Sequence, residues 1–258
     1  MQYMGSKNRF SKDLIPIIQN YIDNMENCKG FLVPFCGGAN IEDKIQCNNK
    51  ISCDNHYYLI KLLRHVQLTT EDLPKTILFE EYNKVRQCYN NKKKGVLDNT
   101  YEDWYIGLVG FCASFGNRFF DGGYMRNSKE DVTGVRVSKS IKNIREQAPN
   151  LKGIKFTCCD FRDLPKDKIK GYVIYCDVPY KNTKQYSTSK NFPYEEYYDW
   201  CRDMSKNNIV LCSEYWMPDD FECIWEKKTT TQINSNRKAN DRKNERVEKL
   251  YIYNKNIK

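Results

Sequence analysis

The organisation of the chain follows from one stretch, Tyr172-Val173-Ile174-Tyr175-Cys176-Asp177-Val178-Pro179-Tyr180. Its first five residues are an apolar run whose length and β-branched content predict a strand. Proline cannot continue a strand ladder, so Pro179 marks the stop. We therefore expect Asp177 to lie just beyond the carboxyl end of a strand, where open α/β sheets place their chemistry.

The four residues Asp177, Val178, Pro179 and Tyr180 can together recognise an amino group. A carboxylate and the next backbone carbonyl both accept hydrogen bonds, so the pair can hold the two protons of an NH2 group. An exposed tyrosine ring beside them can stack on the base that carries this group. The structural alternative is an acid that caps a turn and a tyrosine that fills a gap.

A second motif lies near the amino terminus, where the apolar run 31–36 leads into Gly37-Gly38. A glycine pair after a strand lets a ligand approach the backbone, and a helix predicted over 41–46 would point its amide groups at that ligand. The next predicted strand ends at Asp54. An acid at the end of the second strand of a βαβ unit is where nucleotide folds bind ribose hydroxyls.

The order of the predicted elements indicates an α/β fold. Apolar runs predict strands near residues 31, 51, 155, 173 and 209, with helices between several of them, which implies a mostly parallel sheet covered on both faces. Two further strands, 221–227 and 245–253, are joined by a long polar loop and predict an antiparallel hairpin at one edge. Helical patterns occur over 14–22, 56–68, 77–89, 101–115, 137–147 and 193–204.

Three domain segments are predicted: 1–62 and 150–258 form the α/β domain, and 63–149 is a mainly helical insertion. Within the insertion, the loop 115–127 interleaves arginine, aromatic and glycine residues, which suits contact with phosphates and bases. The alternative is a surface loop with buried aromatic anchors. The residues of this loop expected to contact DNA are Asn117, Arg118, Tyr124 and Arg126.

The charge of the chain favours an anionic partner. The formal net charge is +9 over 258 residues, and basic residues are in excess from Trp225 to the last residue. The loop from Thr229 to Arg246 is therefore predicted to hold phosphates, unless it is simply a solvated face. An aromatic content of 14% argues against disorder.

Twelve cysteines without a C-x-x-C pair, together with only two histidines, predict no zinc or other metal site. Six cysteines lie in or beside apolar segments and are expected to be small buried side chains: Cys36, Cys53, Cys112, Cys158, Cys176 and Cys212. No window approaches the ~18 apolar residues of a membrane span. The sequence therefore predicts a protein of the reducing cytoplasm, not bound to a membrane.

Taken together, these motifs resemble the Dam-like (D12 class) DNA adenine-N6 methyltransferases, in the forms common in phages and prophages. The resemblance covers most of the chain, and its motifs follow the family's order. Those motifs are Tyr3-Met4-Gly5-Ser6-Lys7, Val33-Pro34-Phe35-Cys36-Gly37-Gly38-Ala39-Asn40, Asp54, Asp160-Phe161, Asp177-Val178-Pro179-Tyr180 and Glu245-Arg246-Val247-Glu248-Lys249-Leu250-Tyr251.

The resemblance implies a Rossmann-like methyltransferase domain that moves a methyl group from S-adenosylmethionine to a flipped-out adenine in double-stranded DNA. Asp177-Val178-Pro179-Tyr180 is similar to the catalytic Asp-Pro-Pro-Tyr of the family. The inserted segment corresponds to the target-recognition domain. The residues implied to hold the cofactor are Tyr3, Lys7, Phe35, Gly37, Gly38, Asp54, Asp160, Phe161 and Asp177.

Two positions depart from the family pattern. Val178 replaces the first proline, and it still supplies the carbonyl oxygen that the chemistry needs. Val33 replaces the usual glutamate, which would help to hold the polar end of the cofactor. The alternative interpretation is a catalytically weak or inactive homologue that acts as a DNA-binding or regulatory module. RNA or a free nucleotide fits less well as substrate, given the large inserted domain.

Overall fold

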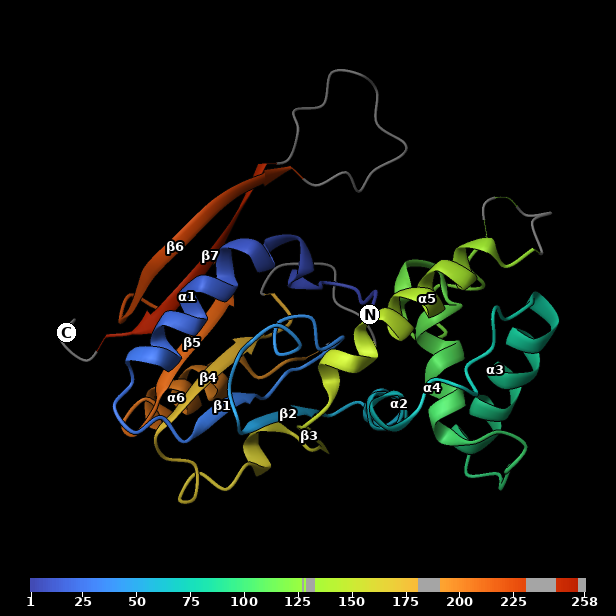
Figure 1. The fold of residues 1–258 in the computed structure, drawn as a ribbon, viewed down its shortest axis with the longest axis horizontal. Helices are drawn as coiled ribbons and strands as arrows, with labels where there is room; N and C mark the ends of the chain where they lie inside the picture. The colour runs from blue at the N-terminus through green and yellow to red at the C-terminus, as the bar shows by residue number, and fades with distance from the viewer. Residues whose placement is uncertain (127, 129–132, 181–190, 231–244, 255–258) are drawn as a thin grey trace. The chain divides into compact units, whose positions relative to one another are not determined.

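The computed structural model describes residues 1–126, 128, 133–180, 191–230 and 245–254, and it is a mixed α/β protein (Figure 1). The chain divides into two compact units. The first contains Met1–Gln19 and Val33–Asp163, and the second contains Asn20–Leu32 and Leu164–Lys258. Among the described residues, no helix is long and apolar enough to span a membrane.

Seven strands form one sheet in the order β3-β2-β1-β4-β5-β7-β6. The pairs β2/β3, β1/β4 and β4/β5 are parallel, whereas β5/β7 and β6/β7 are antiparallel. The predicted fold class, a mostly parallel sheet with an antiparallel edge hairpin, is confirmed. The strands are β1 (Gly30–Val33), β2 (Lys50–Asp54), β3 (Ile154–Cys158), β4 (Tyr172–Asp177), β5 (Ile209–Glu214), β6 (Phe221–Thr230) and β7 (Glu245–Tyr253).

The helices lie close to the predicted spans. They are α1 (Ser11–Asn24), α2 (Tyr57–Leu68), α3 (Phe79–Lys93), α4 (Asp103–Cys112), α5 (Val135–Leu151) and α6 (Tyr194–Met204), with short 3-10 turns η1 (Lys7–Phe10), η2 (Phe115–Asn117) and η3 (Phe161–Asp163). The predicted helix over 41–46 is wrong, because residues 41–44 form only turns. Side chains take the carbonyls that a helix would use: Lys50 donates to the carbonyls of Glu42 and Ile45.

In the first unit, α4 is the central helix. Its residues from Ile106 to Cys112 are all buried, which is the pattern of a helix surrounded by others. It packs on α2, α3 and α5. Gly107 permits the close crossing with α2, since a Cβ there would lie 2.3 Å from the Tyr58 carbonyl oxygen. The stretch 63–149 forms most of this helical part, and its role as a target-recognition domain stays a prediction.

In the second unit, β4 lies between β1 and β5. Residues Val173–Cys176 are all buried, as in parallel strands that are covered on both faces. Cys176 is paired with Cys212, and Asp177 is paired with Ser213. Five of the six selected cysteines are buried as predicted, but Cys158 is exposed. The exception lies on β3, at the edge of the sheet, where a side chain is only partly covered.

Candidate active site

Asp54 organises the glycine turn in the first unit. One carboxylate oxygen accepts the Gly37 amide at 3.0 Å, and the other accepts the His56 amide at 2.9 Å. Burial raises the pKa of Asp54, and the two backbone amides act in the opposite direction. The acid that ends β2 is thus joined to the turn that follows β1, and each of its oxygens can still accept a further hydrogen bond.

His56 begins α2 as its N-cap. Its Nδ1 accepts the Leu59 amide at 3.3 Å, and burial lowers the pKa of its imidazole to about 4. A neutral ring is what this acceptor role requires. His56 therefore has a structural role at the start of α2.

Tyr3 packs directly on the glycine pair. A Cβ at Gly37 would lie 2.8 Å from the Tyr3 ring, and one at Gly38 would lie 2.7 Å from the Tyr3 Cβ. Gly37 also has a φ of +47°, so both conformation and space require glycine there. Lys7 of the same amino-terminal motif is buried, and its Nζ donates to the Gly5 carbonyl at 3.4 Å. The structure therefore brings together two motifs that are separated in the sequence.

A residue that the sequence analysis missed supports this turn. Gln147 of α5 donates to the carbonyls of Gly38 and Ala39 at 3.1 and 2.9 Å, and to the Asp43 carboxylate at 2.9 Å. Ala39 has a positive φ of 52°, which an alanine adopts only where its surroundings hold it. The hydrogen bonds from Gln147 stabilise this conformation. Because Gln147 is distant in sequence, nothing in the local sequence predicts the contact.

Phe35 and Phe161 bring the glycine turn and the segment after β3 together. Their ring centroids are 5.4 Å apart, with Phe161 buried and Phe35 partly exposed. Asp160 accepts three hydrogen bonds from Arg162: from its amide at 3.0 Å, from its Nε at 2.8 Å and from its Nη2 at 3.2 Å. This arginine lowers the pKa of Asp160. The result is an apolar surface beside an ionised carboxylate.

In the second unit, Asp177 is the last residue of β4 and is partly exposed. The sequence analysis places it just beyond the strand, so the strand is one residue longer than predicted. Val178 is buried, and the Pro179 carbonyl accepts the Tyr194 hydroxyl of α6 at 2.7 Å. The tip of the strand and the next two residues are therefore held by the fold. Such an arrangement can present a carboxylate and neighbouring carbonyls to an amino group without reorganisation.

Tyr180 is not the exposed aromatic that the sequence predicts, because only 8% of it is exposed. Its hydroxyl donates to the Glu248 carboxylate of β7 at 2.7 Å, and the Tyr215 ring packs edge-on at 4.4 Å. Burial raises the pKa of the Tyr180 phenol far above its usual value, and the charges of Asp177 and Glu248 add to this. Glu248 belongs to a motif that the sequence analysis quoted without giving it a role, and Tyr215 was missed.

Tyr180→Phe is expected to destabilise the protein by about 1–3 kcal/mol, because the buried Glu248 loses this hydrogen bond. Urea denaturation of both proteins measures the difference. Tyr253→Phe is the control, since that half-buried ring of the same unit packs on Phe221. Equal unfolding midpoints for wild type and Tyr180→Phe would show that the hydrogen bond contributes nothing.

The loop that follows α4 returns on itself. Phe115 donates its amide to the Gly123 carbonyl at 2.8 Å, and Met125 donates to that of Ala113 at 2.7 Å. Asn117 closes the turn by donating from its side chain to the Phe111 carbonyl at 3.0 Å. Arg118 is partly exposed on this loop.

Tyr124 lies in the core and does not offer its ring to DNA, contrary to expectation. Only 7% of it is exposed, its hydroxyl donates to the Ile77 carbonyl at 2.8 Å, and its ring packs on Phe79 and Tyr82. Arg126 lies over the Phe79 ring at 5.4 Å. The tyrosine is therefore the buried anchor of the loop, which is the structural alternative that the sequence left open.

Two residues at this loop were not among those expected to contact DNA. Phe115 is 46% exposed, and the exposed Arg136 at the start of α5 lies over its ring at 5.8 Å. An exposed aromatic with a guanidinium on its face is a surface that nucleic-acid bases and phosphates both accept. Of the basic loop from Thr229 to Arg246, residues 231–244 lie outside the described residues, as does Asn127.

Comparison with known proteins supplies the family. The chain is 24% identical over 219 residues to the Type II methyltransferase M.FokI of Planomicrobium okeanokoites, a match that spans 78% of this chain and 31% of that protein. The rRNA methyltransferase aviRa of Streptomyces viridochromogenes aligns with 97% of this chain and 86% of its own, at a TM-score of 0.42 and 8% identity. Residues 3–199 match the model of the D12 class N6 adenine-specific DNA methyltransferases, and the chain belongs to this family.

Proposed function

We propose that the chain transfers a methyl group from S-adenosylmethionine to N6 of an adenine that is flipped out of duplex DNA. The observation that carries the proposal is Asp177 at the tip of β4, followed by the buried Val178 and the anchored Tyr180. Membership of the family supports this reaction class. The cofactor supplies a methyl group already activated by a sulfonium, so no metal is required for the transfer.

Asp177 and Val178 act on the amino group. The N6 lone pair is delocalised into the ring, which makes it a poor nucleophile. Hydrogen bonds from its two protons to the Asp177 carboxylate and the Val178 carbonyl draw the nitrogen towards tetrahedral geometry. They would also stabilise the positive charge that grows on the nitrogen as the N–CH3 bond forms and the S–CH3 bond of the cofactor breaks, so they act mainly in the transition state. S-adenosylhomocysteine would leave as a neutral thioether, and the methylated nitrogen would release one proton to solvent. Substitution of proline by valine at 178 keeps the carbonyl oxygen, which is why we do not favour the inactive homologue.

Tyr180 is proposed to stack on the flipped adenine. Base flipping costs a few kcal/mol, and stacking on an aromatic ring returns about 1–3 kcal/mol. The hydrogen bond to Glu248 fixes the ring before the base arrives. Because the ring is only 8% exposed and Tyr215 packs on it edge-on, stacking requires that Tyr215 move aside.

The residues of the first unit suit an adenosyl group. Asp54 retains acceptor capacity for ribose hydroxyls, and the turn that it holds places glycine where the backbone can approach a ligand. The Phe35 and Phe161 rings offer an apolar surface for the adenine, with the Asp160 carboxylate close in sequence as an acceptor for its amino group. Tyr3, Lys7 and Gly38 complete the proposed binding set.

Duplex DNA is the proposed partner, held in part by the loop after α4. Arg118 and the exposed Arg136 are proposed to contact phosphates, with Arg126 and Asn117 supporting them. The relative is a Type II methyltransferase, which suggests a modification enzyme of a restriction system, and this chain spans only 31% of that protein. The role in restriction–modification is thus part of the proposal.

Arg118→Ala and Arg136→Ala are each expected to lower the salt dependence of DNA binding. Each lost phosphate contact reduces the slope of log K against log salt by about 1. Fluorescence anisotropy with a duplex at several salt concentrations measures the slope. Lys168→Ala is the control, an exposed lysine of the second unit whose slope should equal that of the wild type. Identical slopes for all four proteins would remove this loop from the DNA interface.

Transfer of tritium from labelled S-adenosylmethionine to DNA tests the reaction itself. Digestion of the product to nucleosides should place the label on N6-methyladenine. An RNA of the same sequence serves as the control substrate. A protein that binds DNA and never transfers the label would be a binding module instead.

A further inference from the structure

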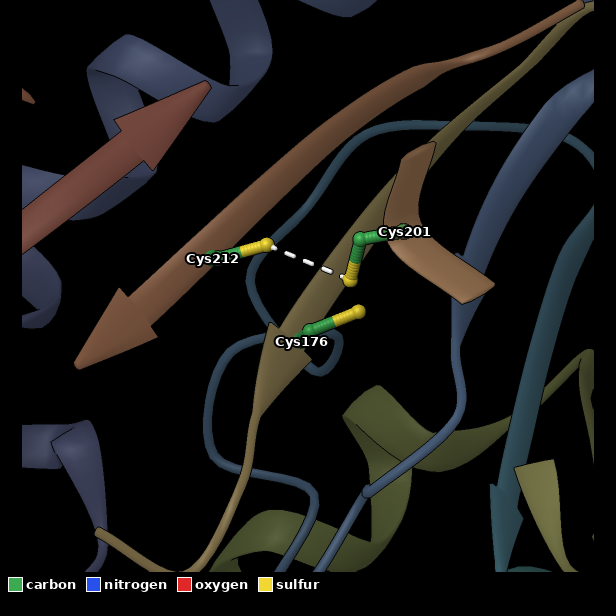
Figure 2. A group of neighbouring side chains, drawn as sticks. All are labelled: Cys176, Cys201 and Cys212. Atoms are coloured by element: carbon green, nitrogen blue, oxygen red, sulfur yellow. Dashed lines mark hydrogen bonds between the residues drawn. The ribbon is translucent and has the colours of Figure 1, made fainter. Parts of the chain in front are cut away.

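Three cysteines converge inside the second unit, and Figure 2 shows their sulfur atoms pointing toward one another. Cys176 comes from β4, Cys212 from β5 and Cys201 from α6. The Sγ atoms of Cys201 and Cys212 are 3.7 Å apart, and all three sulfurs lie within 4.8 Å of one another. All three residues are 0% exposed. None of them has a part in the proposed reaction.

The spacing of the sulfurs suits one metal ion at their centre. A metal–thiolate bond of about 2.3 Å places three equatorial sulfurs about 4 Å apart, so the observed triangle needs only small side-chain shifts. The backbone around it is already fixed: Cys176 and Cys212 are direct partners in the β4/β5 ladder, and Cys201 lies among the buried residues of α6. A site on strands and a helix is more rigid than one on loops.

All three candidate ligand atoms are sulfur. Thiols bind metal ions as thiolates, so metal binding at this cluster would release protons. Soft sulfur ligands select thiophilic ions over Mg²⁺ or Ca²⁺.

We propose that Cys176, Cys201 and Cys212 bind one thiophilic d10 metal ion, Zn²⁺ or Cu⁺, as a structural site. The ion would tie β4, β5 and α6 together one residue before Asp177. Successive side chains of a strand point to opposite faces of the sheet, so the metal and the Asp177 carboxylate lie on opposite sides. The site therefore steadies the strand tip and does not touch the substrate. The absence of C-x-x-C spacing hid it from sequence analysis.

The test uses the whole chain. It is purified in the presence of a reductant and a chelator, and both are then removed under anaerobic conditions. Zn²⁺, and Cu⁺ delivered from a competing ligand, are added in separate arms. After gel filtration, the bound metal per chain is measured by elemental mass spectrometry. The melting temperature is measured on the same samples. We expect one equivalent in one of the two arms, with a rise in melting temperature, and the arm that binds identifies the ion.

Variants show which thiols bind. Cys201→Ser and Cys212→Ser should each weaken binding by more than about 100-fold, because a direct ligand contributes more than the residues around a metal site, whose loss costs about 10- to 100-fold. Cys112→Ser is the matched control, because Cys112 is equally buried in α4 of the first unit and should leave binding unchanged. Because a cluster variant can fail to fold, metal binding by the wild type is a second test. Less than half a metal ion bound per wild-type chain in both arms overturns the proposal. Full binding by folded Cys212→Ser overturns it as well.

Discussion

Asp177→Ala is expected to reduce methyl transfer to DNA by about 100- to 1,000-fold while DNA and cofactor affinity change little. The range is that for removal of one preorganised hydrogen-bonding group that acts on charge developing in the transition state. The alanine removes the acceptor at the tip of β4 and keeps the backbone, so the Val178 carbonyl stays in place. Tritium transfer under single-turnover conditions measures the chemical step, and calorimetry measures cofactor affinity.

Asp177→Asn separates charge from shape. An amide oxygen can still accept one hydrogen bond but cannot stabilise positive charge as a carboxylate does. The transfer rate of this variant should therefore lie between the rates of Asp177→Ala and the wild type. The control is Asp219→Ala, an exposed acid of the same unit that should transfer at the wild-type rate. Transfer by Asp177→Ala within threefold of wild type would end the catalytic assignment.

Features that depend on local sequence were predictable. The apolar run before Asp177 predicted β4, because the burial of a strand leaves a pattern of apolar residues in the local sequence. The acid at the end of β2 was predicted from its place at the end of the second strand of a βαβ unit, and the structure adds that it accepts the Gly37 amide. Residues at strand ends can be placed in this way because the strand itself determines where its carboxyl end lies.

Features that depend on distant partners were not predictable. Tyr180 is buried because Glu248, on a strand near the end of the chain, binds its hydroxyl. Tyr124 is buried because its hydroxyl reaches the Ile77 carbonyl before α3. In both cases the sequence shows an aromatic in a loop, and only tertiary structure decides whether the ring is an anchor or a contact.

The two valines that depart from the family pattern differ in what they remove. Val178 is buried and offers its carbonyl as proline would, so the acceptor is retained. Val33 is 1% exposed at the end of β1, and it replaces a carboxylate with an apolar side chain. We therefore expect Val33 to lower the affinity for the cofactor and to leave the rate of methyl transfer unchanged. This makes the remaining carboxylates of the first unit, Asp54 above all, more important for holding the cofactor.

Asp54→Ala is accordingly the second variant with a large expected effect: cofactor affinity should fall by about 10- to 100-fold. The carboxylate has two tasks, to accept the amides of Gly37 and His56 and to accept hydroxyls of the ligand. Its removal leaves two amides without their acceptor, at about 1–3 kcal/mol each, so the unfolding free energy should fall as well. Calorimetric titration with S-adenosylmethionine and urea denaturation measure the two effects separately.

Asp54→Asn distinguishes the tasks, since an amide can accept only one of the two backbone bonds and offers donors to the other. It should destabilise the turn nearly as much as alanine. Glu71→Ala, an exposed acid of the same unit, is the control for loss of negative charge. If Asp54→Ala unfolds more easily but binds the cofactor with the wild-type dissociation constant, the acid only supports the fold. If both quantities fall together, the turn that Asp54 holds is the turn that binds the ligand, because the same two amides link the carboxylate to Gly37 and to α2.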